Sequence, residues 1–259
     1  MNRTLISVRK PTFALPRRKT FQALAAAAAL LCSAPALAAA ITFESIAQGA
    51  YAAGDTIVES GYNILMLDGP LGGGNGAVMD DASCAILACP GNPSGQFLGV
   101  LNDGGVNFSL SSGVGPGFKL GGLDFAFLAA VGGQPDGSYG QLRLSGLLAD
   151  GTTLTTALDL PGQDANGLFT FAAASFGSAF SSAIFKSLTI DACAYVVDFN
   201  CDNSLENPAF YLAQFALDNV QLNVVPEPVS VMLIGLGMGA MALGRRRTVH
   251  PSKQAAQGA

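Results

Sequence analysis

The apolar residues between positions 41 and 224 occur in short runs, and this pattern most constrains what the chain can fold into. No long stretch repeats its apolar residues every three to four positions, as an amphipathic helix would. Glycine, asparagine, aspartate and proline separate the runs, as they do where strands end in turns. We therefore expect an all-β domain, a jelly-roll-like β-sandwich. The expected strands are 41–46, 62–67, 97–101, 107–110, 122–128, 141–148, 152–158, 168–174, 184–192 and 210–222.

One connection between strands can be predicted in detail. In the run 141–148, Leu142 and Leu144 alternate with polar neighbours, as in a strand with one buried face. The run is followed by Asp150 and Gly151, a pair that readily takes the left-handed conformations of a tight turn. We expect a hairpin around 148–152.

The N-terminal segment has the three parts of a secretory signal peptide. Arg17, Arg18 and Lys19 precede an apolar run at 21–31, which is too short to span a bilayer. Small residues at Ala36 and Ala38 then form an A-x-A cleavage site. We predict that residues 1–38 are a signal peptide and that 39–224 form an exported domain.

The C-terminal segment 225–247 combines a proline-rich entry, an apolar stretch and a basic stop. The apolar stretch 229–244 has 16 residues by count, or about 24 Å of helix at about 1.5 Å per residue. This is slightly short of a hydrocarbon core of about 30 Å, but flanking arginines can extend to the interface. The prolines stop any strand or helix before the membrane. We expect a single transmembrane helix in the inner membrane, with 248–259 as a cytoplasmic tail.

The segment 225–247, paired with a signal peptide, resembles the PEP-CTERM sorting signal of Gram-negative bacteria. The matching residues are the Pro-Glu-Pro motif and the basic cluster, Pro226, Glu227, Pro228, Arg245, Arg246 and Arg247. The resemblance implies handling by exosortase, a membrane cysteine transpeptidase-like enzyme, and the family is associated with exopolysaccharide and biofilm. The alternative is an ordinary membrane anchor that contains Pro-Glu-Pro by chance.

The domain itself resembles a recurrent exported domain that carries this tail. Its last predicted strand, 210–222, contains Gln214-Phe215-Ala216-Leu217-Asp218, which is similar to the QFxxD signature of a PEP-CTERM subfamily. In jelly rolls the first and last strands often lie side by side. We therefore expect the strand at 41–46 to lie next to the strand that contains the signature.

The charge of the chain is unevenly distributed. Of 13 basic and 18 acidic residues, the segment 39–224 holds only three basic residues and 17 acidic ones, a net charge of −14. Such a domain repels nucleic acid and anionic lipid, so we expect no nucleic-acid partner. The charge suits divalent cations or a polysaccharide-rich exterior.

Cysteine usage predicts disulfides. Cys32 leaves with the signal peptide, and Cys84, Cys89, Cys193 and Cys201 remain. An even number in an exported protein indicates disulfides, and three connectivities are open. We favour Cys84–Cys89 and Cys193–Cys201, because each pair closes one short loop. A zinc site is the alternative, but no C-x-x-C spacing supports it.

The domain lacks the usual residues of an enzyme. The one histidine is His250, outside 39–224, which excludes Ser-His-Asp and Cys-His hydrolases and His-ligated zinc there. The glycine-rich stretch 72–76 lacks the lysine of a phosphate loop, and we interpret it as a surface loop.

Two carboxylates acting on a glycoside remain an alternative, drawn from Glu44, Asp80, Asp81, Asp124 and Asp218. The aromatic platforms of such a cleft would be among Tyr51, Tyr62, Tyr139, Tyr195 and Tyr211, each of which is otherwise a core or rim residue.

Calcium is the inorganic partner that the acidic residues favour. Glu44 and Asp218 lie on the expected first and last strands, where jelly-roll carbohydrate-binding modules often hold a structural calcium. Asp198, Asn200 and Asp202 have the alternating spacing of a calcium loop, although the loop lacks its sixth-position glycine and its final glutamate. The alternative for both sets is a solvated acidic surface, and we expect no other cofactor.

These features favour a non-enzymatic exported protein at the cell surface or in the extracellular matrix, with a structural or adhesive role. The alternative is a carbohydrate-binding module that recognises exopolysaccharide. A third hypothesis is a glycan-active enzyme that uses two carboxylates.

Overall fold

The structure is a computed structural model, and it describes residues 38–69, 72–80, 82–83, 89–91, 95–113, 115–129, 133, 135–196, 199–202, 213–226 and 237. Apart from Gly237, these residues belong to one compact unit, Ala36–Glu227. The strands of this unit are β1 (Ala38–Ile41), β2 (Gly49–Ala52), β3 (Thr56–Glu59), β4 (Tyr62–Leu67), β5 (Asn75–Met79), β6 (Phe97–Leu101), β7 (Gly105–Leu110), β8 (Phe118–Phe127), β9 (Gly140–Leu148), β10 (Thr153–Asp159), β11 (Ala172–Ala173), β12 (Phe185–Tyr195), β13 (Cys201–Asp202) and β14 (Phe215–Val224). A short helix, α2 (Ser178–Ser182), precedes β12.

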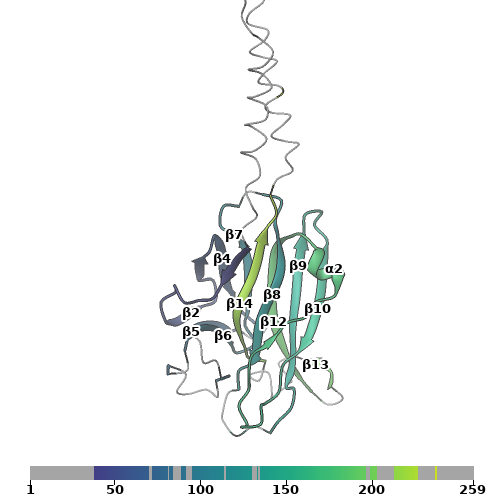
Figure 1. Cartoon of the computed structure of the whole chain (residues 1–259). Coiled ribbons are helices and arrows are strands. Elements are labelled where there is room, and N and C mark those ends of the chain that lie inside the picture. Colours follow the sequence, from purple (N-terminus) through teal and green to yellow (C-terminus); the bar gives the residue numbers. More distant parts are fainter. Residues whose placement is uncertain are drawn as a thin grey trace, which may run out of the picture. The chain divides into compact units, whose positions relative to one another are not determined.

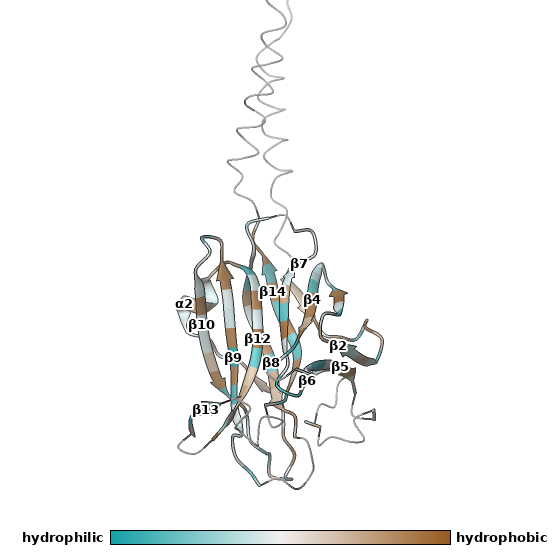
Figure 2. Ribbon diagram, turned by 180° about the vertical axis from the view of Figure 1, so that it is seen from behind, coloured by the Kyte–Doolittle hydropathy of each residue, from teal (hydrophilic) through white to brown (hydrophobic). Residues whose placement is uncertain are grey.

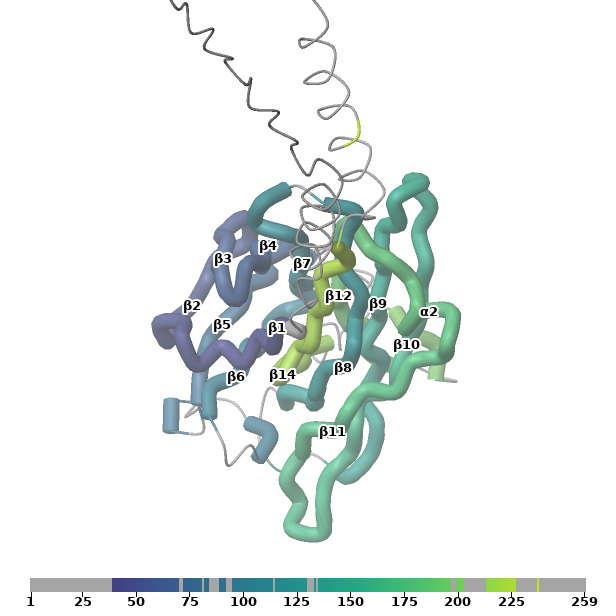
Figure 3. The backbone as a smooth tube through the Cα atoms, turned by 45° about the horizontal axis from the view of Figure 1, so that its top comes forward, coloured from purple at the N-terminus to yellow at the C-terminus, as the bar shows by residue number. Residues whose placement is uncertain are grey.

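The strands form a two-layered β-sandwich. Hydrogen bonds connect them in one path, β2-β5-β6-β14-β8-β12-β7-β4-β3. Within the described residues, β8 joins β12 through one pair, Phe118 with Phe185, and the path folds over there. The first layer is β2-β5-β6-β14-β8, with β1 against β14 and β11 against β8, and the second is β10-β9-β12-β7-β4-β3, with β13 against β12 (Figures 1 and 3). The expectation of an all-β sandwich is confirmed.

The main core fills the space between the two layers. Buried and partly exposed residues alternate strictly in β4, because successive side chains of a strand point to opposite faces. The same alternation brings the inward residues of both layers into one cluster, which includes Phe108, Phe118, Phe127 and Phe185. Figure 2 shows this alternation as bands of hydropathy along the strands.

A second, smaller apolar cluster lies on the other side of the first layer. Ala126 and Ala216 alternate with inward-facing neighbours, so they point away from the main core. Met79, Phe97 and Leu128 complete this cluster, and Phe171 packs against it. The outer face of the first layer is therefore covered in part by apolar side chains.

The first and last strands lie side by side, as predicted. β1 pairs antiparallel with β14, with Ala38 opposite Asn223 and Ile41 opposite Val220. The predicted extent of the first strand, 41–46, is wrong, because β1 ends at Ile41. Phe43 takes a left-handed φ of 61°, and its N–H donates to the Glu59 carboxylate at 3.1 Å. That turn ends the strand.

The predicted hairpin is also confirmed. β9 and β10 pair in register, from Leu147 with Thr153 to Gln141 with Asp159. Gly151 has a φ of 85°, a conformation that glycine adopts at little cost. The Asp150 carboxylate accepts hydrogen bonds from the N–H and hydroxyl of Thr152, and these bonds lower the pKa of Asp150.

Other expected strands need correction. The run 168–174 contains only the two-residue strand β11, which pairs with the edge of β8, and isolated bridges at Phe169 and Thr170. Phe169 packs in the main core, whereas Phe171 packs against the smaller cluster. The glycine-rich stretch 72–76 is not wholly a loop, since Asn75 and Gly76 begin β5. The edge strands β2 and β3 have four residues each and were not expected.

The two targeting segments lie outside the described residues. The signal peptide 1–38 is described only at Ala38, and the apolar stretch 229–244 only at Gly237. In the part of the chain that is described, no helix has the length and apolar character needed to cross a bilayer. β14 ends at Val224 and Pro226 is exposed, so the strand stops before the proline as predicted.

Candidate functional site

The outer face of the second layer is an open and mostly polar surface. Its side chains come from alternate positions of β4, β7, β9, β10 and β12, and apart from the buried Cys193 of β12 they are exposed or half-buried. Apart from one ion pair, the hydrogen-bonding groups across its centre are neutral hydroxyls and amides. They are Asn63, Asn107, Ser109, Gln141, Ser145, Thr155, Ser187 and Thr189.

The ion pair at the centre of this face joins β9 to β12. Arg143 lies opposite Asp191 in register, and its Nε is 2.6 Å from Asp191 Oδ1. The side chains are 45% and 33% exposed. Burial raises the pKa of Asp191, and the Arg143 charge and hydrogen bond oppose that rise. No other described contact uses the terminal guanidinium nitrogens or Asp191 Oδ2, so both partners keep free hydrogen-bonding capacity.

A hollow of about 380 Å³ lies beside the ion pair, and we call it the Arg143 hollow. It is lined by Arg143, Leu144, Ser145, Thr155, Thr156, Ala157 and Asp191. Ala157 of β10 lies opposite Arg143, and its small side chain leaves this space unfilled. Its size lies within the range of small-ligand clefts, about 300–1,000 Å³.

A row of hydroxyl and amide groups borders the Arg143 hollow. Asn107, Thr189, Ser145 and Thr155 lie opposite one another across four strands. Asn107 Nδ2 donates to Thr189 Oγ1 at 2.9 Å, which fixes the orientation of that amide. The row presents both donors and acceptors to solvent.

One end of the same face carries a pair of aromatic rings, the half-buried Tyr195 and the exposed Phe199. Their ring centroids are 5.7 Å apart and the rings are nearly perpendicular, at 80°. Phe199 is 80% exposed, and the Tyr195 hydroxyl donates to Asp159. Burial, followed by the bond to Asp159, raises the pKa of Tyr195.

A disulfide holds this end of the face. Cys193 and Cys201 are bonded, with Cα atoms 5.4 Å apart, which confirms that predicted pair. Cys89 is also in a disulfide, but its predicted partner Cys84 lies outside the described residues. Both findings agree with an oxidising compartment.

The other candidate tyrosines have structural roles. Tyr62 is fully buried in the main core, and Tyr139 stacks on Phe127 with centroids 4.9 Å apart. Tyr51 is half-buried, and its hydroxyl donates to the Ala47 carbonyl at 2.7 Å. Tyr211 lies outside the described residues.

The candidate calcium ligands are dispersed. Glu44 accepts the N–H of Gln96 at 2.8 Å, and Asp218 lies on β14 with its own Oδ1 accepting the N–H of Asn219 at 2.7 Å. Asn200 and Asp202 are described, but Asp198 is not. Across the described residues, no group of three or more His, Cys, Asp or Glu side chains could hold a metal ion. Calcium at these positions stays a prediction.

Two of the candidate catalytic carboxylates do come together. Asp124 of β8 lies directly opposite Asp218 of β14, on the outer face of the first layer. Asp124 accepts a hydrogen bond from the amide of Asn219 at 2.8 Å, and Asp218 is only 5% exposed. A buried carboxylate is closed to a polymeric substrate, so this pair does not favour glycoside cleavage.

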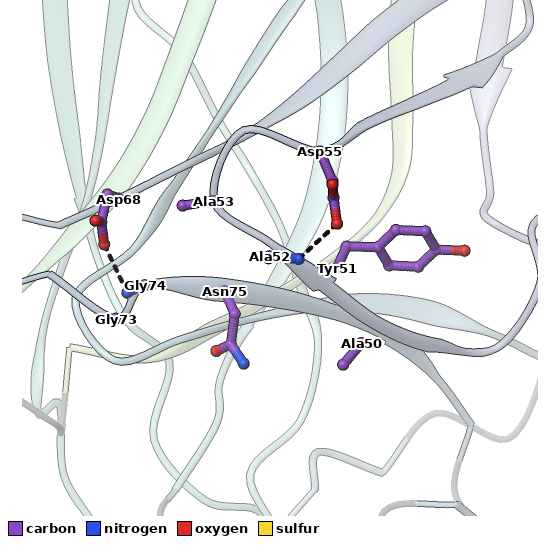
Figure 4. A pocket seen from close by; sticks show the side chains of 9 residues that line it. All are labelled: Ala50, Tyr51, Ala52, Ala53, Asp55, Asp68, Gly73, Gly74 and Asn75. Atoms are coloured by element: carbon purple, nitrogen blue, oxygen red, sulfur yellow. Dashed lines mark hydrogen bonds between the residues drawn. The ribbon is translucent and has the colours of Figure 1, made fainter.

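A second hollow lies between β2, β5 and the turn before β3, and has a volume of about 490 Å³. Figure 4 shows its two carboxylates directed at the backbone and the Tyr51 ring extending away from them. Asp55 accepts the Ala52 N–H and Asp68 accepts the Gly74 N–H, each at 2.8 Å. These acidic groups hold their own loops, so this hollow offers little to a ligand.

Most of the sorting motif lies outside the residues that the structure describes. Pro226 is described and exposed, whereas Glu227, Pro228, Arg245, Arg246 and Arg247 are not described.

Comparisons with known proteins give only distant likenesses. No family model matches the chain, and no curated protein matches it. Among solved structures, the N-terminal tandem of CBM22 domains from Paenibacillus barcinonensis Xyn10C is similar at 12% identity and a TM-score of 0.38, over 76% of this chain and 47% of that one. A xylan-binding domain from CBM 22 is similar at 14% identity and a TM-score of 0.35, over 73% of this chain and 96% of that one. Tailspike protein 4 of bacteriophage CBA120 is similar at 11% identity and a TM-score of 0.30, over 64% of this chain and 20% of that one. This chain thus spans about half the length of the tandem, and at these TM-scores neither fold class nor function is taken from the likeness.

Sequence reasoning missed the residues that define this face. The alternation in the run 141–148 places Arg143 on the polar side of its strand, but its pairing with Asp191 depends on the register of β9 and β12. The strand pattern does not indicate Phe199, although its position between the paired cysteines Cys193 and Cys201 is a usable signal.

Proposed function

We propose that this chain is a non-catalytic exported protein that binds a neutral polysaccharide on the outer face of the second layer. The observation that carries the proposal is the Arg143 hollow in the middle of an open face of neutral hydroxyl and amide groups. The bound polysaccharide would tie the protein to the cell surface or extracellular matrix, which is an adhesive role.

The chemistry of the hollow suits a sugar. A sugar hydroxyl both donates and accepts hydrogen bonds, so it needs a donor and an acceptor close together. Arg143 supplies guanidinium donors and Asp191 a carboxylate acceptor, 2.6 Å apart at their contact. The hydroxyls of Ser145 and Thr155 line the same hollow.

The charge of the domain selects the class of polysaccharide. A net charge of −14 over 39–224 repels uronic-acid, phosphate and sulfate polymers. A neutral glycan meets no such repulsion and can still hydrogen-bond to the face.

We propose a non-catalytic role because 39–224 contains no histidine. In addition, Asp218, which lies opposite Asp124, is buried. Loss of polysaccharide chain length on incubation with the protein would instead support the enzyme alternative.

A binding assay with a matched pair of variants tests the proposal. Full-length protein in mild detergent is incubated with insoluble cellulose, xylan, mannan, curdlan and the polysaccharide of the producing cells, and with immobilised polygalacturonate. Ala157→Leu places a branched side chain on the floor of the Arg143 hollow, whereas Thr153→Leu places it on the same strand outside the hollow.

We expect the wild type and Thr153→Leu to be depleted by at least one neutral polysaccharide but not by polygalacturonate. Ala157→Leu should bind at least tenfold more weakly. Equal binding by Ala157→Leu and Thr153→Leu, or no depletion by any neutral polymer, would contradict the proposal.

Delivery is a separate part of the proposal. The Pro226-Glu227-Pro228 motif, the apolar stretch and the arginines support export, transient anchoring in the inner membrane and processing by exosortase. Mass analysis of mature protein should find a C-terminus near 226–228. Mature protein that retains 245–247 in every preparation would identify an ordinary anchor.

A further inference from the structure

We infer that Tyr195 and Phe199 form a stacking subsite for one pyranose ring of the same polysaccharide. This inference rests on the proposed function and adds a second contact point to the Arg143 hollow. Its ligand class is a neutral oligosaccharide that extends along β12.

The first observation is the exposure of Phe199. At 80% it is the most exposed large apolar side chain of the described residues, ahead of Val58 at 59% and Leu168 at 52%. A single exposed apolar residue is common on protein surfaces, so exposure by itself identifies no site. The conformation and surroundings of Phe199 carry the argument further.

The second observation is that the backbone holds Phe199 outward in a disfavoured conformation. Its φ is 57°, in the left-handed region that bulky residues rarely adopt. Its N–H donates to the Val196 carbonyl at 3.2 Å, and the Val196 N–H donates to the Asn200 carbonyl at 2.9 Å. The Cys193–Cys201 disulfide closes this turn at its base. Such conformations persist where the surrounding structure fixes them, and they cluster at binding sites.

The third observation is the support behind the Phe199 ring. Tyr195 packs perpendicular to it, and the Tyr195 hydroxyl is bonded to Asp159 Oδ1. The same oxygen accepts Gln141 Nε2 at 3.1 Å. Tyr195 is therefore held by Asp159 of β10, which Gln141 of β9 holds in turn. The Phe199 ring packs against this held Tyr195 ring.

The chemistry of this group fits a sugar ring. The face of an aromatic ring is electron-rich and packs well against the weakly positive C–H groups of a pyranose. The Asp159 carboxylate and the Gln141 amide lie beside the rings and can bond to the ring hydroxyls. The negative charge of Asp159 disfavours an anionic sugar at this end of the face.

The spacing indicates an oligosaccharide rather than a single sugar. Tyr195 lies four residues beyond Asp191 on the same face of β12, about 13 Å at about 3.3 Å per residue. One sugar ring cannot contact both positions, whereas an extended chain of several rings can.

The test compares Phe199→Leu with Phe199→Tyr in full-length protein. Leucine keeps an apolar side chain but has no ring face, and tyrosine keeps the ring. Leu168→Ala controls for loss of exposed apolar area elsewhere, since Leu168 is 52% exposed. Binding is measured with the neutral polysaccharide that best depletes the wild type, and melting temperatures confirm that the variants fold.

We expect Phe199→Leu to bind about tenfold more weakly, in line with the loss of one aromatic contact, while Phe199→Tyr and Leu168→Ala bind like the wild type. A soluble hexasaccharide of that polymer should compete far better than its monosaccharide. If the wild type binds, Ala157→Leu loses binding and Phe199→Leu does not, the subsite is overturned and the proposed function stands. If the wild type binds no neutral polymer, the proposed function itself fails.

Discussion

The hydroxyl of Tyr62 gives a quantitative test of the core. Tyr62 is 0% exposed, and its hydroxyl has no hydrogen-bond partner among the described residues. Its ring packs edge-on against Phe118, with centroids 5.4 Å apart. Phenylalanine keeps that packing and removes the hydroxyl. Because an unsatisfied buried polar group costs about 1–3 kcal/mol, we expect Tyr62→Phe to raise the free energy of unfolding by about 1 kcal/mol at pH 7.

The same residue predicts a pH dependence. Burial raises the pKa of Tyr62 from 10.0 to about 12. The unfolded chain therefore loses this proton at a lower pH than the folded chain, and the wild type loses stability as pH rises from 10 towards 12. The loss from Tyr62 is about 1.4 kcal/mol at pH 11, since one pKa unit corresponds to about 1.36 kcal/mol. Tyr62→Phe lacks this loss, so its advantage should grow from about 1 to about 2.4 kcal/mol between pH 7 and pH 11.

Urea unfolding followed by circular dichroism at pH 7, 9 and 11 measures both effects. Tyr51→Phe is the matched control, because the Tyr51 hydroxyl is bonded to the Ala47 carbonyl and its removal should not stabilise the fold. A Tyr62→Phe variant that is less stable than the wild type at pH 7, or whose advantage is the same at pH 7 and pH 11, would contradict these expectations.

Three further results are expected. Arg143→Met should raise the pKa of Asp191 further, because the charge that opposes the effect of burial is gone; carboxyl carbon shifts across pH measure this, and an unchanged or lower value would contradict it. Replacing Cys193 and Cys201 together by serine should lower the free energy of unfolding by about 2–3 kcal/mol, since the disulfide closes a loop with a sequence separation of 8; equal urea midpoints would argue against it. Gly151→Ala should cost about 1 kcal/mol or more at a φ of 85°, and unchanged stability would mean that the turn differs from the one described.

Much of the fold could be predicted because its signals are local. β4 and β6 coincide with the expected runs 62–67 and 97–101, where apolar segments end at turn residues. The Asp150-Gly151 turn specifies its own hairpin, because glycine supplies the left-handed conformation and aspartate bonds to the backbone two residues on.

The errors arose where a tertiary contact overrides a local signal. The composition around Gly76 is typical of a loop, yet Gly76 lies in β5, which pairs with β2 and β6. A Cβ at Gly76 would be 2.4 Å from the sulfur of Met66. Glycine at this position permits close packing rather than a turn. The first strand ends early because Glu59, 16 residues away, accepts the Phe43 N–H.

The candidate site was less predictable than the fold. Its ion pair joins residues 48 apart, and the Tyr195–Asp159 bond joins residues 36 apart. Neither contact can be predicted before the register of β9, β10 and β12 is known. Sequence could identify the polar face of β9, but not the alanine opposite Arg143 that leaves the hollow open.

The most direct test of polysaccharide binding is to map a neutral hexasaccharide onto the protein by amide chemical shifts in isotope-labelled full-length chain. We expect shifts along the outer face of β9, β10 and β12, from Thr155 and Arg143 to Tyr195, that saturate with ligand. Saturable shifts confined to the first layer around Asp124 and Asp218, or no saturable shifts with any neutral hexasaccharide, would contradict it.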